Sequence, residues 1–262
     1  MTPMNPATRP HSLTGWNTAR LKIMTTTANP HHALGRDVWT AARHPLARFL
    51  RGLAAGEPIP NDGAWTRVTP WGPNIQAILC FGTHSILAVS YDFTDNQLEE
   101  IGVNGGPEAT SARVLNHLAG PTGWIGAPNM LMLAAGTGNE NGDSEPLVSR
   151  PDLNQRPTVE IARRTMTEVQ VLGHPNPEEH DVVVIGNGVG GLRGIAVEIA
   201  PERRGQGHGP DLLHRALASI PENEVIASAV FAGDAAMAAA FMAEGFTHIG
   251  SIQYFSSRPE RR

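Results

Sequence analysis

The feature that most constrains this chain is a short glycine-rich turn enclosed by two prolines. Between Pro201 and Pro210, three glycines alternate with larger residues. The β-branched run before Pro201 predicts a strand, because Val and Ile favour strands and proline ends regular structure. Pro210 suits the first turn of a helix, where its missing N–H is not needed. The segment therefore predicts a strand, a tight turn and a helix in direct succession.

Such a turn is suited to binding an anion. Glycines allow a ligand to approach the backbone closely, and the positive end of a helix dipole favours negative charge. Arg204, at the start of the turn, would either pair with a phosphate or brace the turn. We therefore predict that residues 205–209 hold a pyrophosphate.

A second glycine-rich segment, residues 186–191, indicates a different chemistry. It follows the apolar run 182–185 and fits the G-x-G-x-x-G fingerprint of flavin and nicotinamide sites. That fingerprint requires a helix directly afterwards, yet residues 192–199 are β-branched and interrupted by Gly194. We interpret 186–191 as a hairpin turn between antiparallel strands, with an oxidoreductase using Gly186 to Gly191 as the alternative.

Hydrophobic patterning predicts a fold of the α/β class with a mixed (α+β) sheet, because strands and helices alternate. Before residue 136 it predicts a helix over 38–53, a hairpin from 75–81 and 86–91, a helix over 107–118 and a strand over 130–135. Later it predicts strands over 168–172, 182–185, 192–199, 225–231 and 249–255, and helices over 212–220 and 235–244.

Composition changes suggest how the chain is divided. Residues 1–35 lack periodicity and predict a disordered tail, and residues 136–157 are rich in Gly, Asn, Ser and Pro and predict a linker. We expect an N-terminal α/β domain over 36–135 and a second domain over 158–262.

Charge and cysteine content exclude several classes of function. A formal net charge of −5 gives no basic surface for nucleic acid or an anionic membrane, and no apolar run is long enough to span a bilayer. Cys80 is the only cysteine, so neither an internal disulfide nor a cysteine-based zinc site can form. We expect a buried thiol, no metal and a cytoplasmic protein.

Two segments resemble the GNAT (Gcn5-related N-acetyltransferase) superfamily. Residues 197–209, VEIAPERRGQGHG, are similar to its motif A, V-x-P-x-x-R/Q-x-x-G-x-G/A. Residues 234–246, DAAMAAAFMAEGF, are similar to its later segment N-x-x-A-x-x-L-Y-x-x-x-G-F, with Asp234, Met237 and Phe241 replacing Asn, Ala and Tyr. The resemblance covers residues 158–255. The first half could be a degenerate copy of the same fold, although it contains no RxxGxG-like loop.

The resemblance implies an N-acetyltransferase in which an amine attacks the thioester of acetyl-CoA or another acyl-CoA. The pantetheine arm would lie between two splayed strands and bond to the backbone of Val197 and Ile199. The acceptor would be a primary amine on a small molecule or peptide, and an oligomer is possible. The positions assigned to the cofactor are Val197, Ile199, Arg204, Gly205, Gln206, Gly207, His208, Gly209, Asp234 and Phe241.

The acid and base are less well defined. Phe241 stands where many family members have a catalytic Tyr, and Tyr254 is the only tyrosine in this half. Glu198 is the only carboxylate within its predicted strand and is the candidate base. Each has a structural explanation as well, core packing for Tyr254 and a solvated strand face for Glu198. A non-catalytic module that senses acyl-CoA is therefore an alternative to an enzyme.

Overall fold

The structure, a computed structural model, describes residues 43–139, 142 and 145–257. All of them belong to one compact unit, residues 38–262. The tail predicted at residues 1–35 and the first residues of the helix predicted over 38–53 lie outside the described part.

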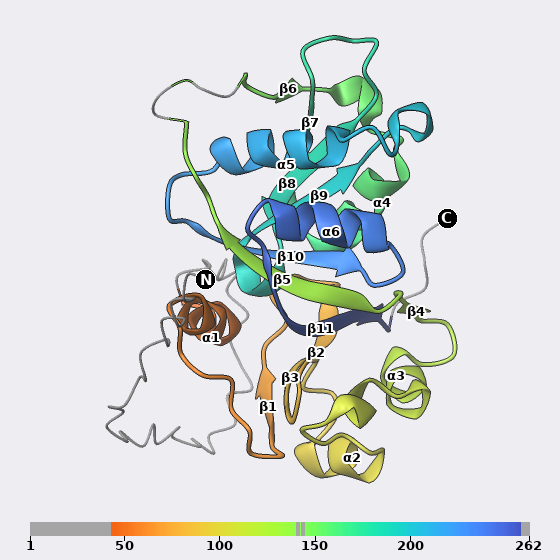
Figure 1. Ribbon diagram of the computed structural model, residues 1–262. Coiled ribbons are helices and arrows are strands. Elements are labelled where there is room, and N and C mark those ends of the chain that lie inside the picture. Colours follow the sequence, from red (N-terminus) through yellow and green to blue (C-terminus); the bar gives the residue numbers. More distant parts are fainter. Residues whose placement is uncertain (1–42, 140–141, 143–144, 258–262) are drawn as a thin grey trace, which may run out of the picture. The chain divides into compact units, whose positions relative to one another are not determined.

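One mixed sheet organises this unit, with the strand order β1-β3-β2-β11-β5-β10-β9-β8-β7-β6 and the short β4 paired with β11 (Figure 1). Parallel and antiparallel pairs both occur, which confirms the predicted mixed α/β class. The strands are β1 (Trp65–Val68), β2 (Gln76–Phe81), β3 (His84–Ala88), β4 (Trp124–Ile125), β5 (Asn129–Ala135), β6 (Val148–Ser149), β7 (Thr167–Gly173), β8 (Val182–Asn187), β9 (Arg193–Glu198), β10 (Val225–Phe231) and β11 (Thr247–Ser256).

Helices cover both faces of the sheet. In Figure 1, α5 and α6 lie in front of β8, β9 and β10, and α4 lies behind them. None of the described helices is long and apolar enough to cross a membrane. The α-helices are α1 (Pro45–Ala54), α2 (Asp95–Glu100), α3 (Ala112–Ala119), α4 (Pro157–Thr165), α5 (His208–Ala218) and α6 (Ala235–Ala243). The 3₁₀ turns are η1 (Pro107–Thr110), η2 (Pro151–Leu153), η3 (Val189–Gly191) and η4 (Pro201–Arg203).

Both halves of the chain build the same sheet. Strand β5, from the first half, lies between β10 and β11 and is antiparallel to both: Leu133 pairs with Ala227 and with Thr247. The core is therefore shared across the predicted linker. The division into domains at 136–157, and the descent of the first half from a second copy, stay predictions.

Side chains on the two faces of the sheet belong to different core clusters. Val197 and Ile199 pack with Leu212 of α5 and Phe241 of α6. On the opposite face, Leu46 and Leu50 of α1 pack with Leu131, Leu133 and Tyr254. Alternation along β5 explains the separation, since Met132 joins the α5 and α6 side while its two neighbours join the α1 side.

Most predicted elements are present, with shifted ends. The helix predicted from residue 38 begins at Pro45, because His44 caps it. The helix predicted over 107–118 is divided at Ser111, which caps α3. The second strand of the first hairpin ends at Ala88, before the expected Tyr91. Helix α4 was missed because it starts at Pro157, inside the predicted linker, and its sequence is largely polar.

The segment 186–191 is a hairpin turn, as predicted. Strands β8 and β9 pair antiparallel from Val182↔Glu198 to Asn187↔Arg193, with η3 between them. Gly190 has φ 63°, and a Cβ on it would lie 2.9 Å from the backbone nitrogen of Ala47. A strand follows the glycines where the dinucleotide fingerprint needs a helix. The oxidoreductase alternative is therefore wrong.

His44 gives a pH-dependent prediction for this fold. Its Nδ1 accepts from the N–H of Leu46 at 3.2 Å and its Nε2 donates to the carbonyl of Thr69 at 2.9 Å, which requires the neutral ring. Desolvation by burial lowers the pKa of His44 below 6.5, although its bond to Thr69 opposes the shift. The unfolded chain therefore binds this proton more readily, and stability is lost as pH falls below about 6.5.

We expect His44→Asn, which keeps a capping acceptor, to reduce the loss of unfolding free energy between about pH 7.5 and about pH 5.5. Denaturant unfolding of wild type and variant at several pH values measures it. Parallel pH curves for the two proteins would contradict the assignment.

Candidate functional site

The glycine turn leads directly into α5. Gly205 has φ 73° and Gly207 has φ 85°, a left-handed conformation that favours glycine. A Cβ built on either would meet no atom within 4 Å, so both face open space. Helix α5 begins at His208, earlier than the predicted residue 212, and Gly207 is its N-cap. No side chain of the cap accepts from the first N–H groups of α5, so these donors have no capping partner.

Gly209 has a different role. It lies in the first turn of α5, where a Cβ would approach the Cβ of Ala240 in α6 to 3.5 Å. A Cβ there would make an ordinary van der Waals contact, so Gly209 marks where α5 and α6 pack together. This contact brings the two segments of the GNAT resemblance, motif A and the later helix, side by side.

Two side chains hold the turn against the end of β9. Arg204 donates through Nε to the carbonyl of Ile199 at 3.1 Å, and Gln206 donates through Nε2 to the carbonyl of Glu202 at 2.8 Å. Arg204 therefore braces the turn, one of the two roles considered for it, and the residue is also exposed.

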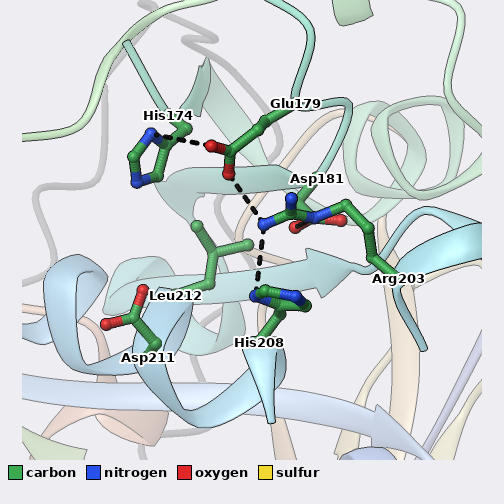
Figure 2. Close-up of a pocket in the computed structure, with 7 residues that line it drawn as sticks. All are labelled: His174, Glu179, Asp181, Arg203, His208, Asp211 and Leu212. Atoms are coloured by element: carbon green, nitrogen blue, oxygen red, sulfur yellow. Dashed lines mark hydrogen bonds and ion pairs between the residues drawn. The ribbon is translucent and has the colours of Figure 1, made fainter. Parts of the chain in front are cut away.

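A polar cavity of about 270 Å³ lies beside the start of α5 (Figure 2). Arg203 is at its centre: Nε lies 2.7 Å from Oδ2 of Asp181, and Nη2 lies 2.7 Å from Oε2 of Glu179 and 3.1 Å from Nδ1 of His208. Burial opposes the charge on Arg203, but its bond to Asp181 and the two carboxylates raise its pKa. The remaining lining residues are His174, Asp211 and Leu212.

Sequence reasoning missed this cluster. It considered Arg204 and His208 but gave no role to Arg203, Asp181 or Glu179. One available signal was a carboxylate directly before the buried strand Val182–Asn187, since such a group needs a partner. The partner's identity depends on tertiary structure.

The edge of β9 that faces β10 is only partly paired. Strand β9 pairs with β8 at six positions but with β10 only at Arg193↔Ile226. The N–H of Ile195 instead donates to the buried Oγ of Ser228 in β10 at 3.0 Å. Because alternate residues of a strand direct their amides to the same neighbour, Val197 also directs its amide toward β10. Ile199 continues this edge into the turn.

Glu198 points away from that edge and has partners. Its Oε1 forms an ion pair with Nη2 of Arg156 at 2.7 Å, and Oε2 accepts from the N–H of Thr158 at 3.0 Å. The second contact satisfies a donor in the first turn of α4. The carboxylate therefore stabilises α4, and any role as a base would have to coexist with these contacts.

Tyr254 is part of the core cluster beneath α1. It is buried, packs edge-on against Trp71 at a centroid distance of 6.3 Å, and its backbone carbonyl accepts from Gly126. Burial raises the pKa of its phenol. Glu198 and Tyr254 lie on the same face of the sheet, opposite Val197, because side chains alternate along each strand.

Asp234 and Phe241 both have structural roles in α6. Oδ1 of Asp234 accepts from the N–H of Met237 at 2.9 Å and caps the helix. Phe241 is 1% exposed and packs against Phe246 at a centroid distance of 4.7 Å. At the position where the resembled family often has a phenol, this chain thus has a buried apolar ring.

Cys80 is a buried thiol, as predicted, and burial raises its pKa. Its Sγ accepts from the hydroxyl of Ser85 at 3.4 Å. Among the residues that the structure describes, no group of His, Cys, Asp and Glu side chains could hold a metal ion.

Comparison with known proteins gave matches only among solved structures. No protein-family model matches the chain, and no curated protein matches it. One similar structure is a GNAT-family protein from Novosphingobium aromaticivorans, at 17% identity and a TM-score of 0.37 over 53% of this chain and 69% of that one. Another is a GCN5-related N-acetyltransferase from Kribbella flavida, at 11% and 0.34 over 57% and 64%. A third is a conserved Staphylococcus epidermidis protein of unknown function, at 13% and 0.34 over 56% and 68%.

All three identities are below 25% and all three TM-scores are below 0.5. The chain also spans less than two thirds of the Kribbella flavida protein's length. The structure itself shows a mixed α/β sheet in which β9, the glycine turn, α5, β10, α6 and β11 follow one another along the chain.

Proposed function

We propose that the chain is an acyl-CoA-dependent N-acyltransferase of the GNAT superfamily, with acetyl-CoA as co-substrate and a primary amine as acceptor. The observation that carries the proposal is the uncapped N-terminus of α5, preceded by left-handed glycines that face open space. Backbone N–H groups there can bind a diphosphate, and the helix dipole favours its charge. The exposed Arg204, in the same turn, would add a positive charge that attracts the diphosphate.

The acyl arm would lie along the edge of β9. Its amides would bond to the backbone of Val197 and Ile199, which β10 leaves without a regular ladder. A bound arm would then act as an additional strand at this edge. Support comes from continuity, because the edge and the phosphate turn are consecutive in the chain.

In the proposed reaction the amine nitrogen attacks the thioester carbon, the C–S bond breaks and the acyl group moves to nitrogen. A backbone N–H would stabilise the oxyanion. Glu198 is the proposed base for the amine proton. Tyr254, the acid suggested by the resemblance, is buried beneath α1 on β11, which β5 and β10 separate from β9, so the leaving thiolate takes its proton from solvent.

The second candidate function is an acyl-CoA sensor without turnover. Two observations favour it: Phe241 is a buried apolar ring, and Glu198 is engaged by Arg156 and Thr158. Both candidates use the same binding site, so binding does not distinguish them but turnover does.

Binding of CoA should be abolished by Gly207→Glu. The substitution puts a side chain with a negative charge into the open space where a phosphate would bind. We expect wild type to gain about 2.7 kcal/mol of stability at 100 times the dissociation constant, and the variant to gain none. Thermal unfolding with and without CoA measures the gain.

Gly82→Glu is the matched control, because Gly82 has φ 74°, faces open space and lies in the β2–β3 hairpin. Its backbone strain is similar, about 1–2 kcal/mol, but its response to CoA should equal that of wild type. An undiminished response in Gly207→Glu would exclude this site.

The enzyme proposal predicts release of free thiol when acetyl-CoA is incubated with a panel of primary amines. Release should depend on the amine and give equal amounts of thiol and acylated amine, since one C–S bond breaks per N–C bond formed. Thiol titration and mass spectrometry measure the two products. Binding of acetyl-CoA without thiol release across the panel would favour the sensor.

Glu198→Gln should lower kcat by about 10²-fold or more while CoA binding is unchanged, because the amide cannot accept the amine proton. Arg156→Gln is the control: it removes the ion pair but keeps the carboxylate, so it should retain turnover. A Glu198→Gln variant that is less stable but turns over normally would limit Glu198 to stabilising α4.

A further inference from the structure

Asp181 is a buried carboxylate that the proposed reaction does not use. It is 3% exposed, and burial at this depth is costly unless its oxygens have partners. Oδ1 accepts from the N–H of Ala200 at 2.8 Å, and Oδ2 accepts from Nε of Arg203 at 2.7 Å. Ala200 caps η4 and Arg203 ends it. Asp181 therefore fixes the segment that connects β9 to the glycine turn.

Arg203 also connects this segment to the start of α5. Its Nη2 bonds to Glu179 and lies 3.1 Å from Nδ1 of His208, the first residue of α5 (Figure 2). A guanidinium can only donate, so Nδ1 of His208 is the acceptor. One side chain thus joins the loop before β8 to both ends of the glycine turn.

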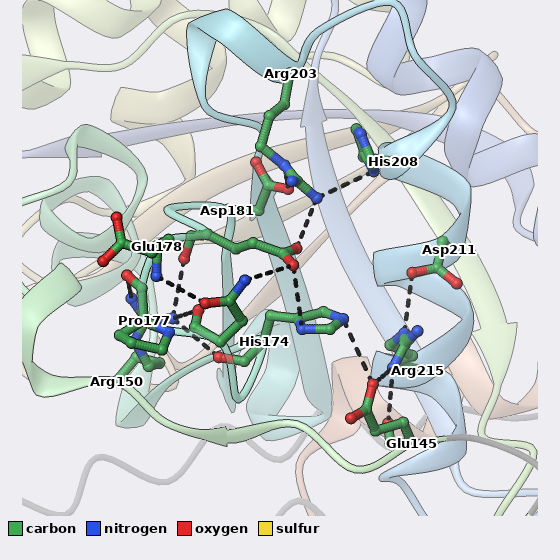
Figure 3. A network of polar contacts seen from close by, with 12 residues as sticks. Glu145, Arg150, His174, Pro177, Glu178, Asp181, Arg203, His208, Asp211 and Arg215 are labelled. Carbon is green, nitrogen blue, oxygen red and sulfur yellow. Dashed lines mark hydrogen bonds and ion pairs between the residues drawn. The ribbon is translucent and has the colours of Figure 1, made fainter.

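The loop before β8 is itself held in place. Arg150 is 5% exposed, and its guanidinium donates to four carbonyl groups of this loop (Figure 3). The acceptors are the carbonyls of His174, Asn176, Pro177 and Glu179, at 2.9 to 3.2 Å. Glu179 and Asp181 therefore reach Arg203 from a well-supported loop.

The two adjacent arginines are in different surroundings. Arg203 has a carboxylate on Nε and another on Nη2, so its charge is compensated within the protein. Arg204 is exposed and donates to a backbone carbonyl, with no carboxylate among its described contacts. An incoming diphosphate would therefore be attracted by Arg204, whereas Arg203 is already committed to the turn.

We propose that Asp181, acting through Arg203 and Ala200, is a positioning residue that fixes the turn for diphosphate binding, and that Arg204 makes the charge contact. The proposal rests on the proposed function. It predicts that losing Asp181 affects ligands with a diphosphate and spares those without one.

The test compares wild type, Asp181→Asn and Glu145→Gln with two probes, CoA and S-acetylpantetheine, which lacks the diphosphate. Calorimetry measures CoA binding and ligand-observed NMR measures the weaker probe. Asp181→Asn should weaken CoA by about tenfold or more, the scale of one charge-assisted hydrogen bond, and leave S-acetylpantetheine unchanged. Glu145 belongs to the same polar network through His174 but does not contact the turn, so Glu145→Gln should change neither (Figure 3).

The outcomes separate the two proposals. If CoA does not bind wild type, the proposed function fails and the role of Asp181 with it. If CoA binds wild type and Asp181→Asn equally, or if the variant weakens both probes alike, only the role of Asp181 is overturned. Should Asp181→Asn not fold, Glu179→Gln removes the more exposed carboxylate and should show the same selectivity for CoA with a smaller loss.

Salt dependence distinguishes positioning from charge. Arg204→Gln should flatten the decrease of CoA affinity with ionic strength, because it removes an exposed charge contact. Asp181→Asn should weaken CoA by the same factor at low and high salt. A flattened salt dependence in Asp181→Asn would show that this carboxylate acts through its charge and would overturn the positioning role.

Discussion

The direct passage from β9 into α5 is the constraint on which the proposed site depends. Pro201 ends the strand, and left-handed Gly205 and Gly207 redirect the chain so that α5 starts at His208 without a capping side chain. Unsatisfied amides at a helix start are unfavourable unless water or a ligand takes them. The ion pair between Asp181 and Arg203 fixes the start of this turn, while Gly205 and Gly207 face open space.

Asp181 and Glu198 show how two carboxylates with similar contacts can differ in exposure. Both are carboxylates at an end of neighbouring strands, and both accept a backbone N–H and pair with an arginine. Asp181 is nearly inaccessible, whereas the side chain of Glu198 is 16% exposed. Of the two carboxylates, Glu198 is therefore the more accessible to solvent. Its position next to Val197 places it near the proposed arm, on the opposite face of the sheet.

Sequence reasoning predicted the strand–turn–helix unit and the 186–191 hairpin because both depend on local chemistry. Proline, glycine and β-branched residues constrain the backbone of their own segment. Three features could not be read in this way. One is the capping of α1 by His44, because histidine is not a usual N-cap residue. The others are the insertion of β5 between β10 and β11 and the bonds of Arg203, because both join residues that are distant in the sequence. The start of α5 was also predicted too late. Gly207 precedes the helix with a left-handed φ, which the sequence alone does not reveal.

The shared sheet also determines what surrounds the two candidate catalytic residues. Because β5 separates β10 from β11, the cluster that contains Tyr254 is built from both halves, with Leu46 and Leu131 packed in it. Glu198 lies on the same face of the sheet, but on β9, and its contacts are with Arg156 and Thr158 at the start of α4. The first half therefore supports the sheet beside the proposed site, whereas the phosphate turn, the edge of β9 and the partners of Glu198 all follow it in the chain.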